Sequence, residues 1–328
     1  RNSLAQYLRY NYVPSPKSIY KDVFKVEPAT IVQFDSTLKI VKKLCYWSMV
    51  DKILDGRSNQ YPDAKVAITE LETALKLTIN EQMLADVPLG AFLSGGVDSS
   101  LIVSLMQNQS KIPVRTFSIG FEEEEYNEAD FAAAVAKHLG TEHTEFVATA
   151  EDALIIVDKI AQIYDEPFSD SSQIPTFIVS ELAKKYVTVC LSGDAGDELF
   201  CGYNRYLMTE KVWSFLSKFP IFVRRAMASF IRSISIDSWN RFNKLLPAKY
   251  KMSNLGDKLH KSANVIIAKD LRQLYQRLTS IWQNPEVVVI GSTIDNIVDN
   301  ESSLENLDSI SWMMATDTMT YMSGDILT

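Results

Sequence analysis

The spacing of hydrophobic and polar residues predicts a helix followed by alternating strands and helices. Apolar residues recur at intervals of three and four between positions 64 and 83, which is typical of a long amphipathic helix. From position 91 onward, short apolar runs alternate with helical patterns. The expected strands are 91–93, 114–121, 144–147 and 187–191, and the expected helices are 97–106, 128–139, 150–164 and 174–185. This alternation predicts an α/β fold with a doubly wound, mostly parallel sheet.

Two further regions flank this pattern. Residues 30–34 and 38–46, separated by the turn at 35–37, predict a β-hairpin. Beyond Tyr206 the pattern is mainly helical, apart from an apolar run at 287–290 that predicts one more strand. We therefore expect a mainly helical C-terminal region beside the sheet.

Composition narrows the class of protein. With 46% hydrophobic and 23% charged residues, the chain has enough apolar material for a folded core. The net charge of −8 argues against a nucleic-acid partner. Three scattered cysteines and three histidines form neither a CxxC pair nor an HExxH motif, so any metal is expected on carboxylates. No apolar run is long enough for a membrane span, and a cytoplasmic location is expected.

A glycine-rich loop lies between the first expected strand of the sheet and its helix. The segment 94–100 reads Ser-Gly-Gly-Val-Asp-Ser-Ser, and backbone N–H groups at such a helix start favour an anion such as phosphate. The Gly-Lys-Ser/Thr ending of a Walker loop is absent. Asp98 would repel phosphate unless a divalent cation lay between them, so we expect Mg²⁺ with the phosphate. The simpler alternative is a tight turn with Asp98 and Ser99 at a helix start.

A second cluster follows the fourth expected strand. The segment 191–200 reads Leu-Ser-Gly-Asp-Ala-Gly-Asp-Glu-Leu-Phe and carries three carboxylates, Asp194, Asp197 and Glu198. In a doubly wound sheet the first and fourth strands are commonly neighbours, so this turn should face the glycine loop. Asp197 could then join Asp98 on Mg²⁺, and Asp194 or Glu198 could hold an amine. A solvated turn that caps a helix is the alternative.

Together, the two motifs resemble the asparagine synthetase family of the N-type ATP pyrophosphatases. The glycine loop resembles the family's pyrophosphate loop, and the acidic turn, which continues to Gly202 and Tyr203, resembles its second signature. Ala195 and Cys201 stand where the family often has glycine, and Ala195 is tolerable there if its φ is negative.

The resemblance implies an adenine-nucleotide α-hydrolase-like fold and a set of site residues. Catalytic roles fall to Asp194, Asp197 and Glu198, and the metal ligands are Asp98 and Asp197. The residues expected to bind ATP are Phe92, Leu93, Ser94, Gly95, Gly96, Asp98, Ser99, Ser100, Ile119, Ser192 and Gly193. Asp170 and Ser171 would contact the substrate, whereas His143 is expected to be structural.

The resemblance also implies a division of the chain. Residues 1–60 would be the remnant of a glutaminase domain and a linker, 61–206 the synthetase core, and 207–328 an incomplete helical part of the synthetase domain. Cys45 cannot act as the N-terminal nucleophile of the glutaminase, so that domain is expected to be absent. The family's phosphate-contacting basic residue is expected beyond Thr328.

The implied reaction is an ATP-dependent amide ligation. Aspartate would form β-aspartyl-AMP with release of pyrophosphate, and ammonia from the absent glutaminase would displace AMP to give asparagine. Alternatives are amidation of another carboxylate, such as a surface-polysaccharide sugar acid, a β-lactam-type cyclisation, or a non-catalytic nucleotide-binding relative. The sequence leaves the oligomeric state open, with a homodimer as one candidate.

Overall fold

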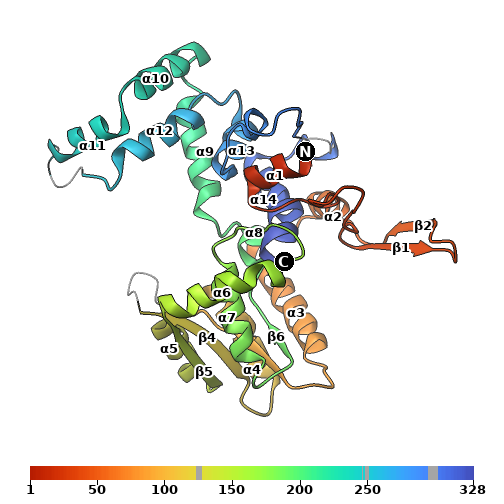
Figure 1. Cartoon of the computed structure of the whole chain (residues 1–328). Helices are drawn as coiled ribbons and strands as arrows, with labels where there is room; N and C mark the ends of the chain where they lie inside the picture. Colours follow the sequence, from red (N-terminus) through yellow and green to blue (C-terminus); the bar gives the residue numbers. More distant parts are fainter. Residues whose placement is uncertain (123–127, 246, 248–250, 295–301) are drawn as a thin grey trace. The chain divides into compact units, whose positions relative to one another are not determined.

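The computed structural model describes residues 1–122, 128–245, 247, 251–294 and 302–328. These residues form two compact units, whose elements are labelled in Figure 1. The α/β unit comprises Val26–Asp197 with Ser323–Thr328, and the helical unit comprises Arg1–Lys25 with Glu198–Met322. The two units are defined by contacts within the chain and do not test the functional division into 1–60, 61–206 and 207–328, which stays a prediction.

The centre of the α/β unit is a parallel sheet of four strands in the order β5-β4-β3-β6. The strands are β3 (Leu89–Phe92), β4 (Arg115–Phe121), β5 (Glu142–Ala148) and β6 (Val189–Leu191). β3 pairs with β4 on one side and with β6 on the other, so strand order reverses between β3 and β6. In a sheet of this kind, ligands bind beyond the carboxyl ends of the strands at that reversal.

Helices cover both faces of this sheet. They are α3 (Ala64–Gln82), α4 (Val97–Gln109), α5 (Ala129–Leu139), α6 (Ala150–Ile163) and α7 (Gln173–Ala183). On one face, Ala91 and Leu93 pack with buried residues of α3, α4 and α5. On the other face, Phe117 packs with Leu182 of α7. The doubly wound parallel fold is therefore confirmed, with its strands apolar because both faces are covered.

Local sequence signals set where several of these helices begin and end. The Asp63 side chain accepts a hydrogen bond from Val66 N at the start of α3, and Thr149 and Asp152 form a capping box at the start of α6. Gly140 ends α5 with φ 72°, a conformation that favours glycine. These caps satisfy backbone groups that the helix termini would otherwise leave unpaired.

The predicted hairpin is present in the α/β unit. β1 (Thr30–Phe34) and β2 (Ile40–Cys45) pair antiparallel, and α2 (Met49–Ser58) follows them. Asp35 Oδ1 accepts hydrogen bonds from the backbone N–H groups of Thr37 and Lys39, which closes the turn.

The helical unit contains α1 (Asn2–Tyr10) and most of the elements after β6. These are α8 (Gly196–Phe200), α9 (Asn204–Leu216), α10 (Ile221–Ser233), α11 (Ile236–Leu245), α12 (Leu255–Val265), α13 (Leu271–Thr279), η3 (Pro285–Val287), η5 (Ser302–Leu304), α14 (Ser309–Asp317) and the π-helix η6 (Thr318–Ile326). Both α8 and η6 extend into residues of the α/β unit. Among the described residues, no helix combines the length and apolar character needed to cross a membrane.

The strand predicted at 287–290 is wrong. Pro285 opens the short helix η3, and the backbone N–H of Val289 donates to Pro285 O at 2.8 Å. Val287 and Ile290 are largely exposed. β-branched residues favour a strand only where a neighbouring strand can pair with them, and the local turn prevails here.

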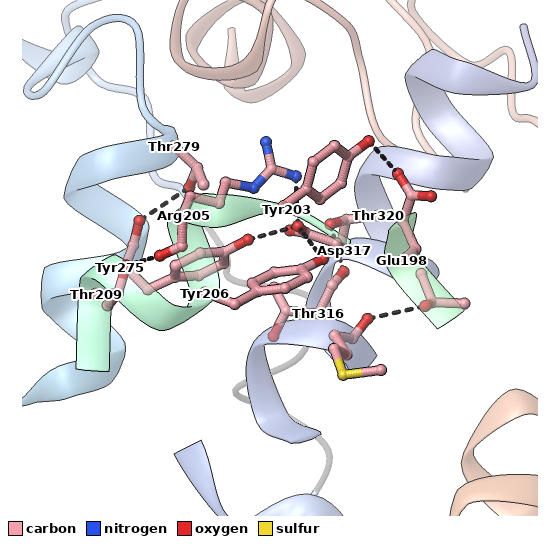
Figure 2. A network of polar contacts seen from close by, with 12 residues as sticks. Glu198, Tyr203, Arg205, Tyr206, Thr209, Tyr275, Thr279, Thr316, Asp317 and Thr320 are labelled. Atoms are coloured by element: carbon pink, nitrogen blue, oxygen red, sulfur yellow. Dashed lines mark hydrogen bonds and ion pairs between the residues drawn. The ribbon is translucent and has the colours of Figure 1, made fainter. Parts of the chain in front are cut away.

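The helical unit is held together by a buried polar network around Asp317, drawn in Figure 2. Asp317 Oδ2 accepts hydrogen bonds from Arg205 Nη2 at 2.5 Å, Tyr206 Oη at 2.8 Å and Tyr275 Oη at 2.5 Å. These partners come from α9 and α13, whereas Asp317 ends α14. Burial and the Asp317 carboxylate raise the pKa of Tyr275, so its hydroxyl stays a donor.

We predict that Asp317→Ala destabilises the helical unit by about 3 kcal/mol or more, because the substitution leaves the Arg205 guanidinium largely buried without its counter-charge. Tyr275→Phe removes one donor only and should cost about 1 kcal/mol. Urea unfolding followed by circular dichroism measures both changes. Asp257→Asn, at an exposed position of α12, is the control. Equal effects of Asp317→Ala and Asp257→Asn would refute the importance of the network.

Candidate functional site

The glycine loop joins β3 to α4 as the sequence predicts. Gly96 is the N-cap of α4, and Gly95 has φ 81°. A Cβ at Gly95 would lie 2.7 Å from Phe131 Cβ and 2.7 Å from Ala132 N, so both the backbone angle and the space require glycine. The loop therefore packs directly on the start of α5.

The serines of this loop differ in their contacts. Ser99 Oγ lies 3.0 Å from Ser94 Oγ and accepts a hydrogen bond from Ser94 N, and Ser94 Oγ accepts one from Gly96 N. These bonds hold the loop in its turn. Ser100 Oγ is buried and has no hydrogen-bond partner among the described residues. A buried hydroxyl of this kind is suited to donate to a bound anion.

The acidic turn after β6 lies directly against the glycine loop. A Cβ at Gly193 would lie 2.6 Å from Ser99 N, and a Cβ at Gly196 would lie 2.5 Å from Asp98 Cγ. A larger residue at position 193 would displace the backbone of the opposite loop, and one at position 196 would displace the Asp98 side chain. The expectation that the two motifs meet at the carboxyl ends of the first and fourth strands is therefore confirmed.

The carboxylates of Asp98 and Asp197 interact within this junction. Burial raises the pKa of Asp98, and the negative charge of Asp197 raises it further. Two carboxylates held together in this way are stabilised by a bound cation. No group of three or more His, Cys, Asp or Glu side chains among the described residues is arranged to hold a metal ion. Mg²⁺ commonly binds one or two carboxylates together with substrate phosphates, so this pair fits that ion.

A pocket of about 190 Å³ opens beside the glycine loop, at the carboxyl ends of β3 and β4. Four of the predicted nucleotide-binding residues line it: Phe92, Leu93, Ser94 and Ile119. The other lining residues are Phe117, Ser118, Phe121, Glu128, Ala132 and Val179. Its wall is mainly apolar with a few polar groups, which is the usual character of a small-molecule site.

The remaining predicted residues lie in different surroundings. Asp194 is exposed on the acidic turn. Ser192 and Gly193 are half-buried and are not among the residues that line the pocket, and Gly193 lies against the start of α4. Glu198 belongs to the helical unit and is 1% exposed, and its Oε1 accepts a hydrogen bond from Tyr203 Oη at 2.6 Å. The catalytic roles of Asp194, Asp197 and Glu198 stay predictions.

A row of polar side chains on one face of β4 and β5 was not predicted. Ser118 Oγ lies 3.2 Å from His143 Nε2, and His143 Nδ1 lies 2.9 Å from Thr116 Oγ1. Burial lowers the pKa of His143, although the charge of Glu145 opposes this effect. The imidazole is therefore neutral at pH 7. Thr116 and Ser118 alternate with apolar residues in β4. This alternation is the sequence signal that could have predicted a polar face on the strand.

A second missed feature is a pair of carboxyl groups in the α/β unit. Asp325 is 6% exposed and is hydrogen-bonded to Asp170. Burial and the charge of Asp170 raise the pKa of Asp325 to about 7. Asp170 also accepts a hydrogen bond from Ser172 Oγ. Asp170 was predicted to contact substrate, but nothing in the local sequence around position 325 indicates that the two acids meet.

The backbone of Ala195 differs from the expected conformation. Its φ is +74° rather than negative, and Cys201, the other departure from glycine, has φ +61°. Both positions thus have the left-handed conformation that favours glycine, and the side chains present are tolerated at a cost. The close approach of Gly196 to Asp98 leaves the turn little freedom to relax.

Comparison with known proteins identifies several relatives. The family described as asparagine synthase matches residues 70–328. A putative glutamine-hydrolysing asparagine synthetase 2 from Methanocaldococcus jannaschii is 39% identical over 225 residues, which cover 68% of this chain and 42% of that protein. Glutamine-hydrolysing asparagine synthetase 1 from Bacillus subtilis is 34% identical over 242 residues, which cover 72% of this chain and 37% of that protein.

A longer match and a solved structure complete the comparison. A putative glutamine-hydrolysing asparagine synthetase from Mycobacterium tuberculosis is 28% identical over 330 residues, 99% of this chain and 47% of that protein. The chain thus spans less than half the length of these relatives. An NH3-dependent NAD synthetase from Campylobacter jejuni has a TM-score of 0.30 and 12% identity, covering 62% of this chain and 95% of that one.

We predict that Ala195→Gly stabilises the protein by up to about 1 kcal/mol, because glycine relieves the left-handed strain and loses part of that gain to its greater freedom when unfolded. Ala153→Gly, in the first turn of α6, is the matched control and should cost about 0.5–1 kcal/mol. Thermal unfolding of the two variants measures the difference. A loss of stability in Ala195→Gly as large as that in Ala153→Gly would contradict the strain argument.

We predict that Asp325→Asn stabilises the protein at pH 8 and has little effect at pH 4. A raised folded-state pKa means that folding favours the protonated acid, so the native protein loses stability as pH rises from about 4 to about 7. Asparagine carries no charge and avoids this loss, for a gain of about 2 kcal/mol at pH 8. Urea unfolding at several pH values measures the effect, with the exposed Asp158→Asn as control. A gain independent of pH would rule out the proposed cause.

Proposed function

Because the chain belongs to the asparagine synthase family, we propose that it contributes the ATP-dependent half of an amide ligase. In this proposal a carboxylate substrate is activated as an acyl-adenylate, and ammonia then forms the amide. The relatives are named as glutamine-hydrolysing asparagine synthetases, so aspartate is the carboxylate we propose and asparagine the product.

The observation that carries the proposal is the junction of the glycine loop and the acidic turn. Gly193 and Gly196 allow the second loop to lie on the first, beside the apolar pocket and at the point where strand order reverses. This junction brings together a helix N-terminus, two interacting carboxylates and the Ser100 hydroxyl, which has no hydrogen-bond partner in the described part of the chain. A nucleoside triphosphate needs these same elements: an apolar slot for its base, donors for its phosphates and carboxylates for its cation.

In the first step, a carboxylate oxygen of the substrate attacks the α-phosphorus of ATP. The bond from that phosphorus to the oxygen bridging to the β-phosphate breaks, and pyrophosphate leaves. Backbone N–H groups of the loop 94–100 and the Ser100 hydroxyl donate to the pyrophosphate oxygens. Asp98 and Asp197 would hold Mg²⁺, which neutralises charge on the departing phosphates when bound.

In the second step, ammonia attacks the acyl carbon and AMP leaves. The nitrogen loses a proton as the amide forms, and the exposed Asp194 carboxylate on the acidic turn is the proposed acceptor of that proton. The ammonia would come from a glutaminase activity elsewhere. The chain's contribution is to hold the reactants in line and to stabilise charge.

We predict that the chain binds ATP in the presence of Mg²⁺ and that Asp98→Asn weakens this binding at least about tenfold, because one cation ligand is lost. Isothermal titration calorimetry with and without Mg²⁺ measures it. Asp86→Asn, an exposed position before β3, is the control and should bind as the unchanged protein does. ATP binding that is indifferent to both Mg²⁺ and Asp98→Asn would refute the metal assignment.

The acyl substrate is tested by the exchange of labelled pyrophosphate into ATP. The reaction should require aspartate, because only an acyl-adenylate can return to ATP with labelled pyrophosphate. Exchange that requires a different carboxylate would retain the ligase and replace its substrate. ATP binding without exchange under any carboxylate would leave a nucleotide-binding module.

A further inference from the structure

The helices α10, α11 and α12 form a basic part of an otherwise acidic protein. Residues 221–265, which we call the basic arm, contain nine lysines and arginines and two acidic residues, a net charge of +7. The whole chain has a net charge of −8, so the rest of it carries −15. Within the arm, α12 lies against both α10 and α11 (Figure 1). This separation of charge favours an anionic partner for the arm.

The cations of the basic arm are exposed and are not compensated by carboxylates. Seven are exposed, among them Arg225 on α10 and Arg241 and Lys244 on α11. The ion pairs of the described residues lie elsewhere, so no carboxylate in that part of the chain pairs with these cations. Arg224, by contrast, is buried and donates to three backbone carbonyls, so it serves the fold. The exposed cations are available to phosphate groups.

The basic arm also exposes large apolar side chains. On α11, Trp239, Phe242 and Leu245 are three residues apart, and Phe242 and Leu245 are 50% and 82% exposed. On α10, Phe222 and Phe230 are 70% and 63% exposed. Edge-to-face contacts of the Trp239 ring with Phe230 and Phe242, at centroid distances of 6.5 and 6.3 Å, join the two helices into one apolar surface. A partner that covers this surface gains free energy from its burial.

Contacts with α12 hold this surface in place. A Cβ at Gly256 would lie 2.4 Å from Ile236 O, so α12 begins directly against α11. Arg232 Nη2 of α10 donates to Asn264 Oδ1 at 2.6 Å, close to the end of α12. The exposed side chains of α10 and α11 thus stand on packed helices, and a partner need not order these helices before it binds.

We propose that the basic arm binds the surface of a bilayer that contains anionic phospholipids. Its exposed aromatic and aliphatic side chains enter the boundary between headgroups and acyl chains, and Arg225, Arg241 and Lys244 contact lipid phosphates. Helices that carry Lys and Arg beside Trp, Phe and Leu are typical of binding in the plane of a membrane surface. This inference concerns where the protein is held, and it does not depend on the proposed ligase activity.

The pattern of side chains favours a bilayer over other anionic partners. Single-stranded nucleic acids stack their bases on open ring faces, whereas the rings of Phe230, Trp239 and Phe242 are turned toward one another. An acidic protein surface, such as that of a second copy of this chain, matches the charge of the arm. A bilayer matches both the charge and the exposed apolar side chains, because acyl chains lie directly beneath the phosphates.

The first test measures co-sedimentation of the chain with vesicles of equimolar phosphatidylglycerol and phosphatidylcholine, and with vesicles of phosphatidylcholine alone. We expect at least about tenfold tighter binding to the mixed vesicles, and we expect added salt to weaken it because salt screens the attraction. Arg225→Gln/Arg241→Gln should weaken this binding at least about tenfold. Lys65→Gln/Lys137→Gln, at exposed positions on α3 and α5, is the matched control and should bind as the unchanged protein does.

The second test concerns the apolar contribution. Phe222→Ser should weaken binding to the mixed vesicles about tenfold, because a phenylalanine side chain no longer leaves water. Phe24→Ser, at a position that is 71% exposed outside the arm, is the matched control. Thermal unfolding checks that both variants stay folded. Insertion is measured by the quenching of tryptophan fluorescence by brominated phosphatidylcholine in the mixed vesicles, which should decrease in Trp239→Phe and persist in Trp47→Phe.

Several outcomes would overturn this inference. Equal binding to both kinds of vesicle would do so, as would equal binding of Phe222→Ser and Phe24→Ser. Self-association without lipid, measured by analytical ultracentrifugation and lost in Phe222→Ser, would assign the surface to a second copy instead. Tighter binding to single-stranded RNA than to the mixed vesicles would assign it to nucleic acid. None of these measurements involves ATP binding or pyrophosphate exchange, so the proposed function is judged separately.

Discussion

The site depends on one steric constraint, the contact between two loops at the point where strand order reverses. Because β3 and β6 are parallel neighbours, the segments that follow them leave the sheet at the same edge. Gly193 lies against the backbone of Ser99 and Gly196 against the carboxylate of Asp98, and a Cβ at either position would overlap its neighbour. The contact puts Asp98 and Asp197 within reach of each other at a helix start, where their mutual repulsion favours a cation and the backbone favours an anion. Gly193 and Gly196 are therefore needed for the packing of the two loops, whether or not they also contact a ligand.

The buried carboxylates of the two units have different partners. Asp317 accepts three hydrogen bonds on one oxygen, including one from a guanidinium, so its charge is compensated within the helical unit. In the α/β unit, by contrast, Asp98 faces Asp197, Asp325 faces Asp170, and Ser100 lacks a partner among the described residues. Compensated networks stabilise a fold, whereas uncompensated groups raise its energy until something binds. Buried atoms without a hydrogen-bond partner occur in both units, Ser100 Oγ in the α/β unit and Gln6 Oε1 and Arg277 Nε in the helical unit among them. The pairs of facing carboxylates, by contrast, lie in the α/β unit, and they favour that unit as the place where a cation is received.

Much of this architecture is readable from the sequence because parallel strands covered on both faces are apolar throughout, and because caps and glycine turns are local signals. The sheet, its helices, the hairpin and the family resemblance were predicted and are confirmed. The failures have tertiary causes. Residues 287–290 have strand-forming side chains but a local turn at Pro285. The angle at Ala195 follows from the loop contact, and the pairings of Asp325 with Asp170 and of Ser118 with His143 join residues that are distant in sequence. The roles of the site residues remain predictions.

The helical unit is assembled from both ends of the chain. The backbone N–H of Ile281 donates to Arg9 O at 2.8 Å, and Asn2 exchanges hydrogen bonds with Thr293. All of Val26–Asp197 is therefore inserted between two parts of one compact body. During synthesis on the ribosome, residues 1–25 emerge long before their partners, whereas the sheet and its covering helices are already complete once β6 has emerged. The α/β unit can therefore form most of its core first during translation. The helix α1 can pack only later, when the residues of the helical unit that follow β6 have been synthesised.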